Sequence, residues 1–245
     1  MKGKEQKLEK SKTVSPIGPN EDLKGAGPTS NHSLAQIEGK PKKSALRENI
    51  EAIIVAIVLA LFIRTFVVQA FKIPSGSMLN TLLIGDHILV NKFIYGVRLP
   101  FKGTVLIPVT EPKHDDIVVF KFPEDPSKDF IKRVVGVEGD TIEIRNKKVY
   151  VNGDLKESDF AIYLDPYVQH SEQNRDNLGP FKVPENSIFV MGDNRDHSYD
   201  SRFWGFVDVK DLKGKAFMIY WSWNGENKES FMDYVRWDRI FQRLK

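Results

Sequence analysis

A long apolar segment near the N-terminus constrains the fold of this chain most. Residues 50–71 read IEAIIVAIVLALFIRTFVVQAF, and the uncharged part, Ala52–Ile63, is twelve residues long. With Thr65–Phe71 included, the segment reaches about 20 residues, the length of a helix that crosses a bilayer. Arg64 is its one strong interruption, and its long stem can carry the charge toward lipid headgroups. We expect residues 49–71 to form a single membrane anchor helix.

The residues before this segment predict its orientation. Residues 1–48 are rich in Lys, Gly, Pro, Ser and Asn and have no apolar period, which predicts a flexible basic tail. By the positive-inside rule, the basic residues put the N-terminus in the cytoplasm and everything after residue 71 outside. They lie just before the apolar segment: Lys40, Lys42, Lys43 and Arg47.

Two alternatives compete with a retained anchor. A secretory signal peptide is the first, because Val68-Gln69-Ala70 resembles a small-residue cleavage site. However, the 49 residues before the apolar segment far exceed the leading region of an ordinary signal peptide. A helix buried in a protein core is the second, since the uncharged part alone is short for a span.

After the apolar segment, hydrophobic residues alternate or form short runs, which predicts strands. The predicted strands are His87–Val90, Ile117–Lys121, Phe130–Val137, Thr141–Arg145, Lys148–Val151, Ser187–Met191 and Ala216–Trp221. Arg145–Lys148 predicts a hairpin turn. Residues 152–182 are polar and predict an irregular insertion, and Phe231–Leu244 predicts a short amphipathic helix. Residues 72–245 are thus expected to form a mainly β domain with Greek-key or barrel-like character.

Composition narrows the possible chemistry. The chain has no Cys, which excludes disulfides, thiolate metal sites and a cysteine nucleophile. Its net charge of +3 is too small to indicate nucleic-acid binding. The five His residues are scattered without the spacing of metal ligands, so we expect no metal site.

A serine-rich stretch follows the apolar segment at Pro74–Met78. If this stretch is extended, Ser75 and Ser77 share a face, and Gly76 allows close approach of another backbone. One hydroxyl could then attack a carbonyl, while the other, with a backbone N–H, donates to the oxyanion that forms. Taken alone, two serines at this spacing are more often part of an ordinary loop.

A lysine lies in the predicted strand Phe130–Val137. Strand alternation places Lys132 on one face with Phe130 and Val134, and Arg133 on the other. To act as a base, the amine must be neutral, which requires its pKa to fall from ~10.4 toward ~7–8. Burial in an apolar pocket can cause such a fall, whereas Arg133 stays charged. The alternative is a solvated lysine on an edge strand.

A third motif spans Gly192–Arg202. Its residues Ser198, Asp200 and Arg202 share one face if the chain is extended. Asp200 and Arg202 can form an ion pair, and the Ser198 hydroxyl could orient the amine of Lys132. A charged turn or a calcium loop is the alternative, but the segment lacks a closing Glu with regular ligand spacing. His197 is interpreted as a solvated loop residue.

The chain resembles bacterial type I signal peptidase (leader peptidase) from residue 48 to its C-terminus. Five segments match the family's pattern in order: the anchor helix, Pro74–Met78, Gly85–Val90, Ile131–Gly136 and Gly192–Gly205. Three features depart from that pattern. Asn80 stands where the family usually has Pro, His197 where Asn or another polar residue is common, and there is one apolar segment where some relatives have two.

The resemblance implies roles for individual residues. Ser77 would be the nucleophile and Lys132 the general base, with Ser75 and the backbone N–H of Ser77 as the oxyanion hole. Ser198 would hold Lys132, and two further residues would support the loop, namely Asp200 and Arg202. The candidates to line shallow pockets for small side chains are Phe71, Ile73, Leu82 and Ile131.

The resemblance also implies a cellular setting. It implies a fold of antiparallel sheets with an apolar surface that rests on the bacterial inner membrane. The enzyme would be single-pass, need no cofactor, and cut preproteins after Ala-x-Ala, near the export machinery. Nucleic acid is not an expected partner. The alternatives are another Ser-Lys protease, from pilus or conjugation assembly or from self-cleaving repressors, and a non-catalytic membrane-tethered β module.

Overall fold

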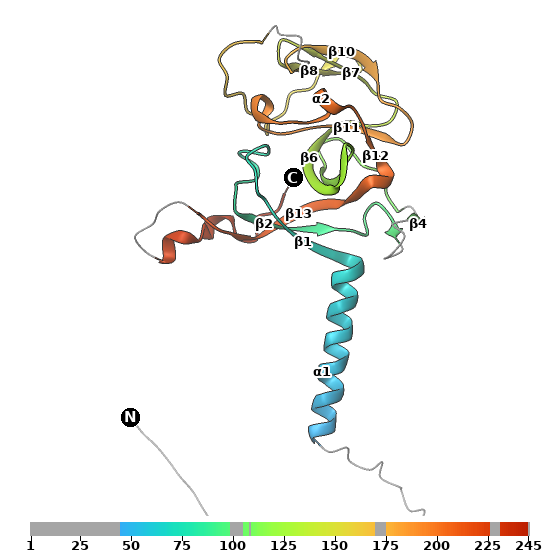
Figure 1. Cartoon of the computed structure of the whole chain (residues 1–245), viewed down its shortest axis with the longest axis vertical. Coiled ribbons are helices and arrows are strands. Elements are labelled where there is room, and N and C mark those ends of the chain that lie inside the picture. Colours follow the sequence, from blue (N-terminus) through green and yellow to red (C-terminus); the bar gives the residue numbers. More distant parts are fainter. Residues whose placement is uncertain (1–44, 99–104, 108, 170–174, 226–230, 245) are drawn as a thin grey trace, which may run out of the picture. The chain divides into compact units, whose positions relative to one another are not determined.

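The computed structural model describes residues 45–98, 105–107, 109–169, 175–225 and 231–244. Most of the predicted tail, residues 1–44, lies outside the described residues. Its last four residues belong to helix α1, which spans Ala45–Phe62 and continues into a π-helical turn, η1, at Ile63–Val67. The helix therefore begins before residue 49, where the anchor was expected to start (Figure 1).

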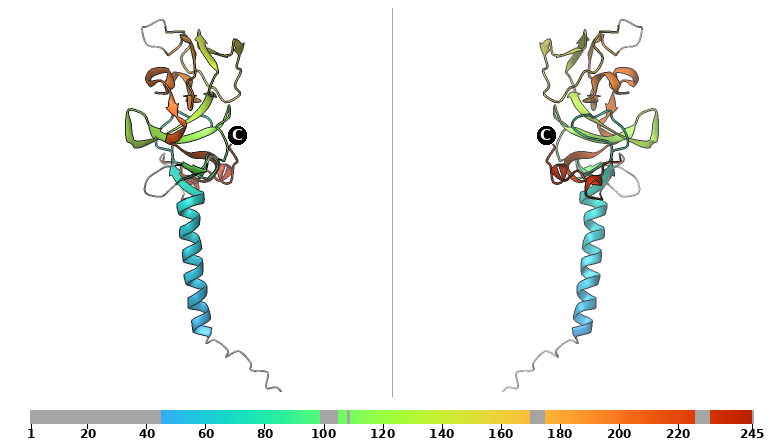
Figure 2. Two further views of the ribbon diagram at one scale, coloured as in Figure 1. Left: turned by 90° about the vertical axis from the view of Figure 1, so that its right-hand side faces the viewer. Right: turned by 90° about the vertical axis from the view of Figure 1, so that its left-hand side faces the viewer.

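The C-terminal end of the predicted helix is wrong. Val68–Lys72 form strand β1, which pairs with β2 (Asp86–Asn91) from Val68 opposite Asn91 to Lys72 opposite His87. Pairing with β2 satisfies the backbone N–H and C=O groups that a longer helix would have satisfied within itself. Figure 2 shows from two sides that the helical segment of α1 and η1 leads into this strand.

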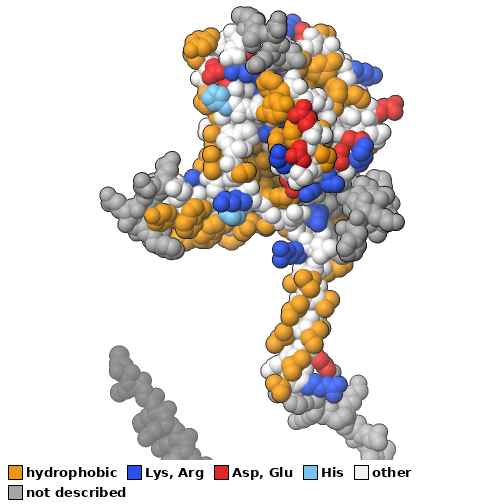
Figure 3. All heavy atoms as spheres, in the orientation of Figure 1, with side chains coloured by type: hydrophobic (Ala, Val, Ile, Leu, Met, Phe, Trp, Pro, Cys, Tyr) orange, Lys and Arg blue, Asp and Glu red, His pale blue; other side chains and the backbone are white. Residues whose placement is uncertain are grey.

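Apolar side chains dominate the surface of α1 and the start of η1 (Figure 3). They are between 42% and 70% exposed: Leu46, Ile50, Ile53, Ile54, Val55, Ile57, Val58, Leu59, Leu61, Phe62 and Ile63. The first turns of α1 also carry Arg47, Glu48 and Glu51. Among the described residues, none of the helices combines the length and the apolar character needed to cross a membrane.

The rest of the described chain is mainly β, and its paired strands are antiparallel. A seven-stranded sheet has the order β1-β2-β13-β5-β6-β11-β12. Its further strands are β5 (Ile117–Phe122), β6 (Asp125–Gly136), β11 (Ser187–Met191), β12 (Val207–Asp208) and β13 (Leu212–Ser222).

A four-stranded sheet has the order β10-β7-β8-β9, and β3 pairs with β4. These strands are β3 (Val97–Arg98), β4 (Val105–Ile107), β7 (Thr141–Arg145), β8 (Lys148–Val151), β9 (Asp154–Leu155) and β10 (Leu178–Lys182). The short helical pieces are η2 (Arg195–His197), α2 (Ser201–Trp204), η3 (Val209–Asp211), η4 (Phe231–Tyr234) and η5 (Trp237–Arg239).

The strand predictions are confirmed. β7, β8 and β11 have the predicted bounds, and the predicted hairpin joins β7 to β8, with Arg145 opposite Lys148. β2, β6 and β13 each begin before the predicted run, and β5 begins at the predicted residue but extends one residue further, to Phe122. The insertion at residues 152–182 is irregular where it is described, apart from a single bridge at Ile162 and strands β9 and β10.

The predicted C-terminal helix is wrong, because this segment pairs with β13 instead. Beyond Lys215, β13 no longer lies against β5, which leaves an edge open for pairing. The C-terminal segment takes that edge: the Ile219 N–H donates to the Gln242 carbonyl, and the Leu244 N–H donates to the Phe217 carbonyl. Only the 3₁₀ turns η4 and η5 are helical there.

The seven-stranded sheet is buried on both faces at β5. Strand alternation sends Ile117 and Val119 into one core cluster with Ile88 and Ala216. It sends the intervening Val118 and Phe120 into a second cluster that includes Val134, Val190 and Leu212. A third cluster lies between the small sheet and β11, with Ile142, Ile144, Val149 and Phe189.

The loop between β1 and β2, residues 73–85, is fastened at its base and along its length. The N–H of Ile73 donates to the Asp86 carbonyl at 2.8 Å, and the Gly85 N–H donates to the Ile73 carbonyl at 3.0 Å. Met78 and Leu82 are fully buried in the first core cluster. The loop thus presents Ser77, which directly precedes Met78, from a fixed base.

Gly85 closes this loop at a position where a side chain does not fit. Its φ is +92°, and a Cβ there would lie 2.1 Å from the Trp223 carbonyl oxygen. Gly139 has a similar φ of +85°, but a Cβ there would meet nothing within 4 Å. The two glycines therefore differ in the available space and not in backbone conformation.

We predict that Gly85→Ala destabilises the protein more than Gly139→Ala does. Both changes should lose about 1–2 kcal/mol to the left-handed backbone, and Gly85→Ala about 1–3 kcal/mol more to the clash. Thermal unfolding in detergent would show a Tm several degrees lower for Gly85→Ala. Equal Tm values would contradict the close packing of this loop against the Trp223 backbone.

Candidate active site

The β1–β2 loop and strand β6 bring a serine and a lysine together. Lys132 Nζ donates a hydrogen bond of 2.7 Å to Ser77 Oγ across 55 residues of sequence. Ser77 lies in the loop, just before the buried Met78, and Lys132 lies in β6 opposite Val118 of β5. The two groups that sequence reasoning assigned to attack and proton transfer are therefore in direct contact.

The lysine is removed from solvent. Lys132 is 4% exposed, and its Nζ lies 5.5 Å from the centre of the Phe130 ring. The pKa of Lys132 is lowered to about 8, chiefly by burial; the charge of Arg202 also lowers the pKa, while the charges of Asp200 and Asp193 raise it. The amine is thus half neutral near pH 8, a state in which it can accept a proton.

The segment after β11 packs against the serine. The Asn194 backbone N–H donates to the Ser77 carbonyl at 3.1 Å, and Asn194 Nδ2 donates to the Gly76 carbonyl at 3.1 Å. At Gly192, a Cβ would lie 2.3 Å from Ser198 Oγ and 2.4 Å from the Ser77 carbonyl oxygen. Only glycine permits this approach, so the Gly192–Asn194 backbone fixes the orientation of Ser77.

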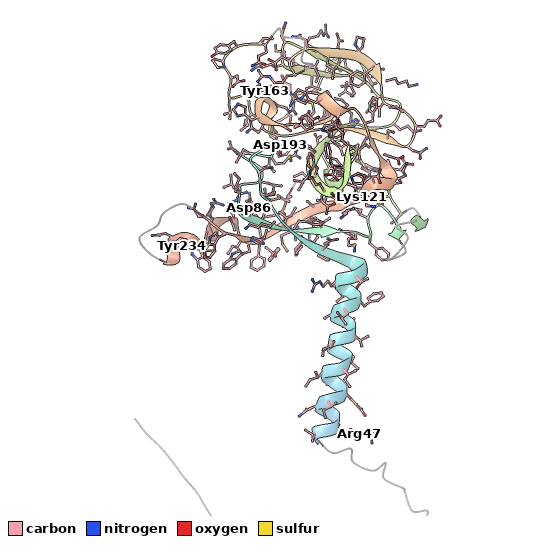
Figure 4. The ribbon with its side chains drawn as sticks, viewed as in Figure 1. Arg47, Asp86, Lys121, Tyr163, Asp193 and Tyr234 are labelled. Carbon is pink, nitrogen blue, oxygen red and sulfur yellow. The ribbon has the colours of Figure 1, made fainter. Side chains whose placement is uncertain are left out.

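An ion pair that sequence reasoning missed fixes the same segment. Arg133, 1% exposed, binds Asp193 through Nε and Nη2, each at 2.8 Å. Thr81 Oγ1 also donates to Asp193 at 2.5 Å, so Asp193 links β6 to the β1–β2 loop. Figure 4 labels Asp193. Both residues lie within motifs recognised in the sequence, since Arg133 adjoins Lys132 and Asp193 follows Gly192.

Asp200 and Arg202 form the expected ion pair. Arg202 Nε and Nη2 donate to the Asp200 carboxylate at 2.8 and 2.9 Å, and both residues are buried. Asp200 also caps α2 and accepts a 3.0 Å hydrogen bond from the Gly192 N–H. This pair therefore anchors both ends of the Gly192–Arg202 segment.

Ser198 is placed near the dyad but does not hold the lysine in this structure. It is 6% exposed and adjoins Gly192, yet its Oγ has no hydrogen-bond partner. The expected hydrogen bond to Lys132 is not formed, and the amine donates to Ser77. Ser75, two residues before Ser77, is exposed, and His197 is exposed, as expected, with Asp165 3.5 Å away.

The four expected pocket residues divide into two groups. Ile73 and Leu82 are 2% and 0% exposed and belong to the first core cluster. They form the support beneath the site and present no surface to a substrate, which corrects the expectation for both. Phe71 and Ile131 are partly buried against the same cluster and keep some exposed surface.

Asn80 borders an open pocket of about 430 Å³ beside the serine loop. This pocket is also lined by Thr81, Phe160 and Arg243. Among the described residues, no group of three or more His, Asp or Glu side chains is placed to hold a metal ion.

Comparison with known proteins identifies relatives of this chain. The family model for signal peptidase, peptidase S26, matches residues 46–221. A signal peptidase I from Pseudomonas aeruginosa is 35% identical over 232 residues, which cover 82% of each chain. A signal peptidase I from Aquifex aeolicus is 37% identical and covers 72% of this chain and 85% of its own.

Among solved structures, a signal peptidase I from Enterococcus faecalis has 30% sequence identity and a TM-score of 0.37. It covers 43% of this chain and 97% of its own. The family match and the two curated relatives confirm the resemblance drawn from the motifs. The chain belongs to the signal peptidase family, peptidase S26.

Proposed function

We propose that this protein removes N-terminal signal peptides from exported preproteins by means of a Ser77–Lys132 dyad. The observation that carries the proposal is the 2.7 Å hydrogen bond between a buried amine and a serine hydroxyl. A charged lysine could not take a proton from serine, but an amine with a pKa of about 8 can. The family membership supplies the reaction class.

In the proposed mechanism, neutral Lys132 accepts the Ser77 hydroxyl proton as Oγ attacks the carbonyl carbon of the scissile peptide. The oxyanion accepts hydrogen bonds from the Ser77 backbone N–H and the Ser75 hydroxyl. Lys132 then gives its proton to the departing amine, which leaves as the new N-terminus of the mature protein. A water molecule, deprotonated by the same amine, hydrolyses the ester and regenerates Ser77.

Supporting roles follow from the contacts around the dyad. Asp200 and Arg202 hold the segment that carries Gly192 against Ser77. The unpartnered Ser198 hydroxyl is available to accept a hydrogen bond from Lys132 once the amine has moved during the reaction. The support of the Gly192 segment and the hydrogen bond to Ser198 would each keep Lys132 within reach of Ser77 Oγ.

We further propose cleavage after small residues in the Ala-x-Ala pattern. Phe71 and Ile131 offer partly exposed apolar surface over a tightly packed core. In this proposal that surface forms shallow apolar pockets, which would accept Ala and reject bulky side chains. Ile73 and Leu82 would limit the depth of these pockets from beneath.

The proposed setting is the bacterial inner membrane. The exposed apolar side chains of α1 and η1 support a lipid contact for residues 49–67. The N-terminus would then be cytoplasmic and residues 72–245 would lie outside, close to membrane lipid and the export machinery.

The dyad predicts a specific loss of activity. With a preprotein that carries an Ala-x-Ala junction, Ser77→Ala should abolish cleavage, and Lys132→Met should lower kcat by about 10²–10⁴-fold through loss of the base. Mass spectrometry would locate the wild-type cut after the second Ala. Lys121, labelled in Figure 4, lies exposed on β5, so Lys121→Met should stay fully active. Near-wild-type cleavage by Lys132→Met would exclude the dyad.

The pH dependence should report the buried amine. Because only neutral Lys132 accepts a proton, kcat/KM should fall as the pH decreases through about 8, the lowered pKa of Lys132. It should reach a plateau at higher pH, well below the ordinary lysine pKa of 10.5. A midpoint near 10.5, or a profile without a basic limb, would show that another group is the base.

The proposed anchor predicts that the chain stays in the membrane during extraction and that added protease reaches only the part outside the cytoplasm. The full chain in inner membranes should resist extraction with alkaline carbonate, because its apolar segment contacts lipid. Protease added to spheroplasts should digest residues 72–245 and spare the N-terminal tail. Release by carbonate, or digestion of the tail alone, would contradict the anchor or its orientation.

A further inference from the structure

Four arginines among the described residues are almost fully buried, and one of them differs from the rest. Three of them have a carboxylate partner within 3 Å: Arg133 with Asp193, Arg175 with Asp176, and Arg202 with Asp200. Arg195 is also buried, at 4% exposed, but it forms no ion pair with any described carboxylate. Burying a cation without a counter-charge is strongly unfavourable.

The guanidinium of Arg195 keeps unused donors. Its Nε is buried and has no hydrogen-bond partner. Its Nη1 has one long contact, 3.4 Å to the Tyr163 hydroxyl oxygen. Figure 4 labels Tyr163 on the side of the small β7–β10 sheet. An anion with hydrogen-bond acceptors at this point would therefore neutralise the charge of Arg195 and accept a hydrogen bond from its Nε.

Arg195 lines a pocket of about 370 Å³ between β8, β9 and the segment at residues 156–163. A second unpaired polar group lies there, because Ser158 Oγ is buried and has no partner. The other charged groups of the pocket are the cations Lys148 and Lys156 and the exposed acids Glu157 and Asp159. Lys156 is already paired with Asp115 at 3.1 Å.

We propose that this pocket binds a small oxyanion, with the Arg195 guanidinium and the Ser158 hydroxyl as donors. A guanidinium presents N–H groups as a planar fork that matches the oxygens of a carboxylate or phosphate. Two sources offer this chemistry: free inorganic phosphate, and the carboxylate of an acidic side chain in a peptide. The pocket is separate from the Ser77–Lys132 pair, so the proposal does not depend on the proposed reaction.

The pocket lies next to the segment that orients Ser77. The Arg195 N–H donates to the Ile162 carbonyl at 3.0 Å, and the preceding Asn194 N–H donates to the Ser77 carbonyl. The Ile162 N–H in turn donates to the Asp193 carbonyl at 2.8 Å. An anion held by Arg195 would therefore stabilise the strand-like contact that supports the active-site segment.

Calorimetric titration of the full chain in detergent with inorganic phosphate, at constant ionic strength, tests the proposal. We expect saturable binding to one site per chain. Arg195→Met should weaken it by at least about tenfold, through loss of a charge-assisted pair, and Ser158→Ala several-fold. Arg145→Gln is the matched control, because Arg145 is exposed on β7 and paired with Glu143; its affinity should equal that of the wild type.

A second arm distinguishes the two sources. A short neutral-capped peptide with one Asp should displace phosphate if peptide carboxylates are accepted, and the same peptide with Asn should not. Displacement assigns the pocket to peptide carboxylates, and phosphate binding without displacement assigns it to free oxyanions; both support the proposal.

Two results would overturn it. One is that neither phosphate nor the Asp peptide binds saturably to the wild type. The other is that binding persists undiminished in Arg195→Met and Ser158→Ala. If Arg195→Met does not fold, the phosphate affinities of Ser158→Ala and Arg195→Lys are the test. Lysine keeps the positive charge but lacks the planar N–H groups of the guanidinium, so Arg195→Lys should also bind phosphate more weakly.

Discussion

The burial of the Lys132 amine without a carboxylate partner is the constraint on which the site depends. Two acids, Asp193 and Asp200, lie close enough to raise its pKa, and a direct pair with either would keep it charged. Each is bound instead to an arginine, Asp193 to Arg133 and Asp200 to Arg202. Because these acids are neutralised, desolvation prevails and the amine loses its proton near pH 8.

Three consecutive residues after Gly192 join the parts of the molecule that surround the serine. Asp193 binds Arg133 on β6, and Asn194 binds the backbone of Gly76 and Ser77. Arg195 faces the pocket beside the small sheet. Since all three lie on one short segment, a change in any of these contacts is expected to reach Ser77 through a rigid, hydrogen-bonded backbone.

Local pattern was sufficient to predict two strands of the small sheet, whereas the residues of the proposed dyad were assigned through the resemblance to a known family. Alternation at Thr141–Arg145 and Lys148–Val151 determines those strands, because their apolar residues fit only one register. Ser77 and Lys132 were identified through ordered motifs. Val68–Lys72 and the C-terminal segment were mispredicted because each pairs with a strand distant in sequence, β2 and β13, and such pairing outweighs local propensity.

The ion pairs, and the burial of two expected pocket residues, could be recognised only from the three-dimensional fold. Arg133 was assigned to the opposite face from Lys132, and only the fold brings Asp193, from the segment after β11, to its guanidinium and to Thr81 of the β1–β2 loop. Ile73 and Leu82 flank the motif as expected, yet only three-dimensional packing shows that they lie inside the core. Sequence spacing defines which residues are neighbours along a strand and not how deeply they are buried.

The protonation state of Lys132 is the central claim, and it can be measured directly. In protein with ¹³C-labelled lysine in detergent micelles, the Cε resonance of Lys132 is identified by its absence in Lys132→Met and followed with pH. The account predicts a titration midpoint near 8, well below that of the exposed lysines. A Lys132 resonance that stays in its charged position until the other lysines titrate would contradict it.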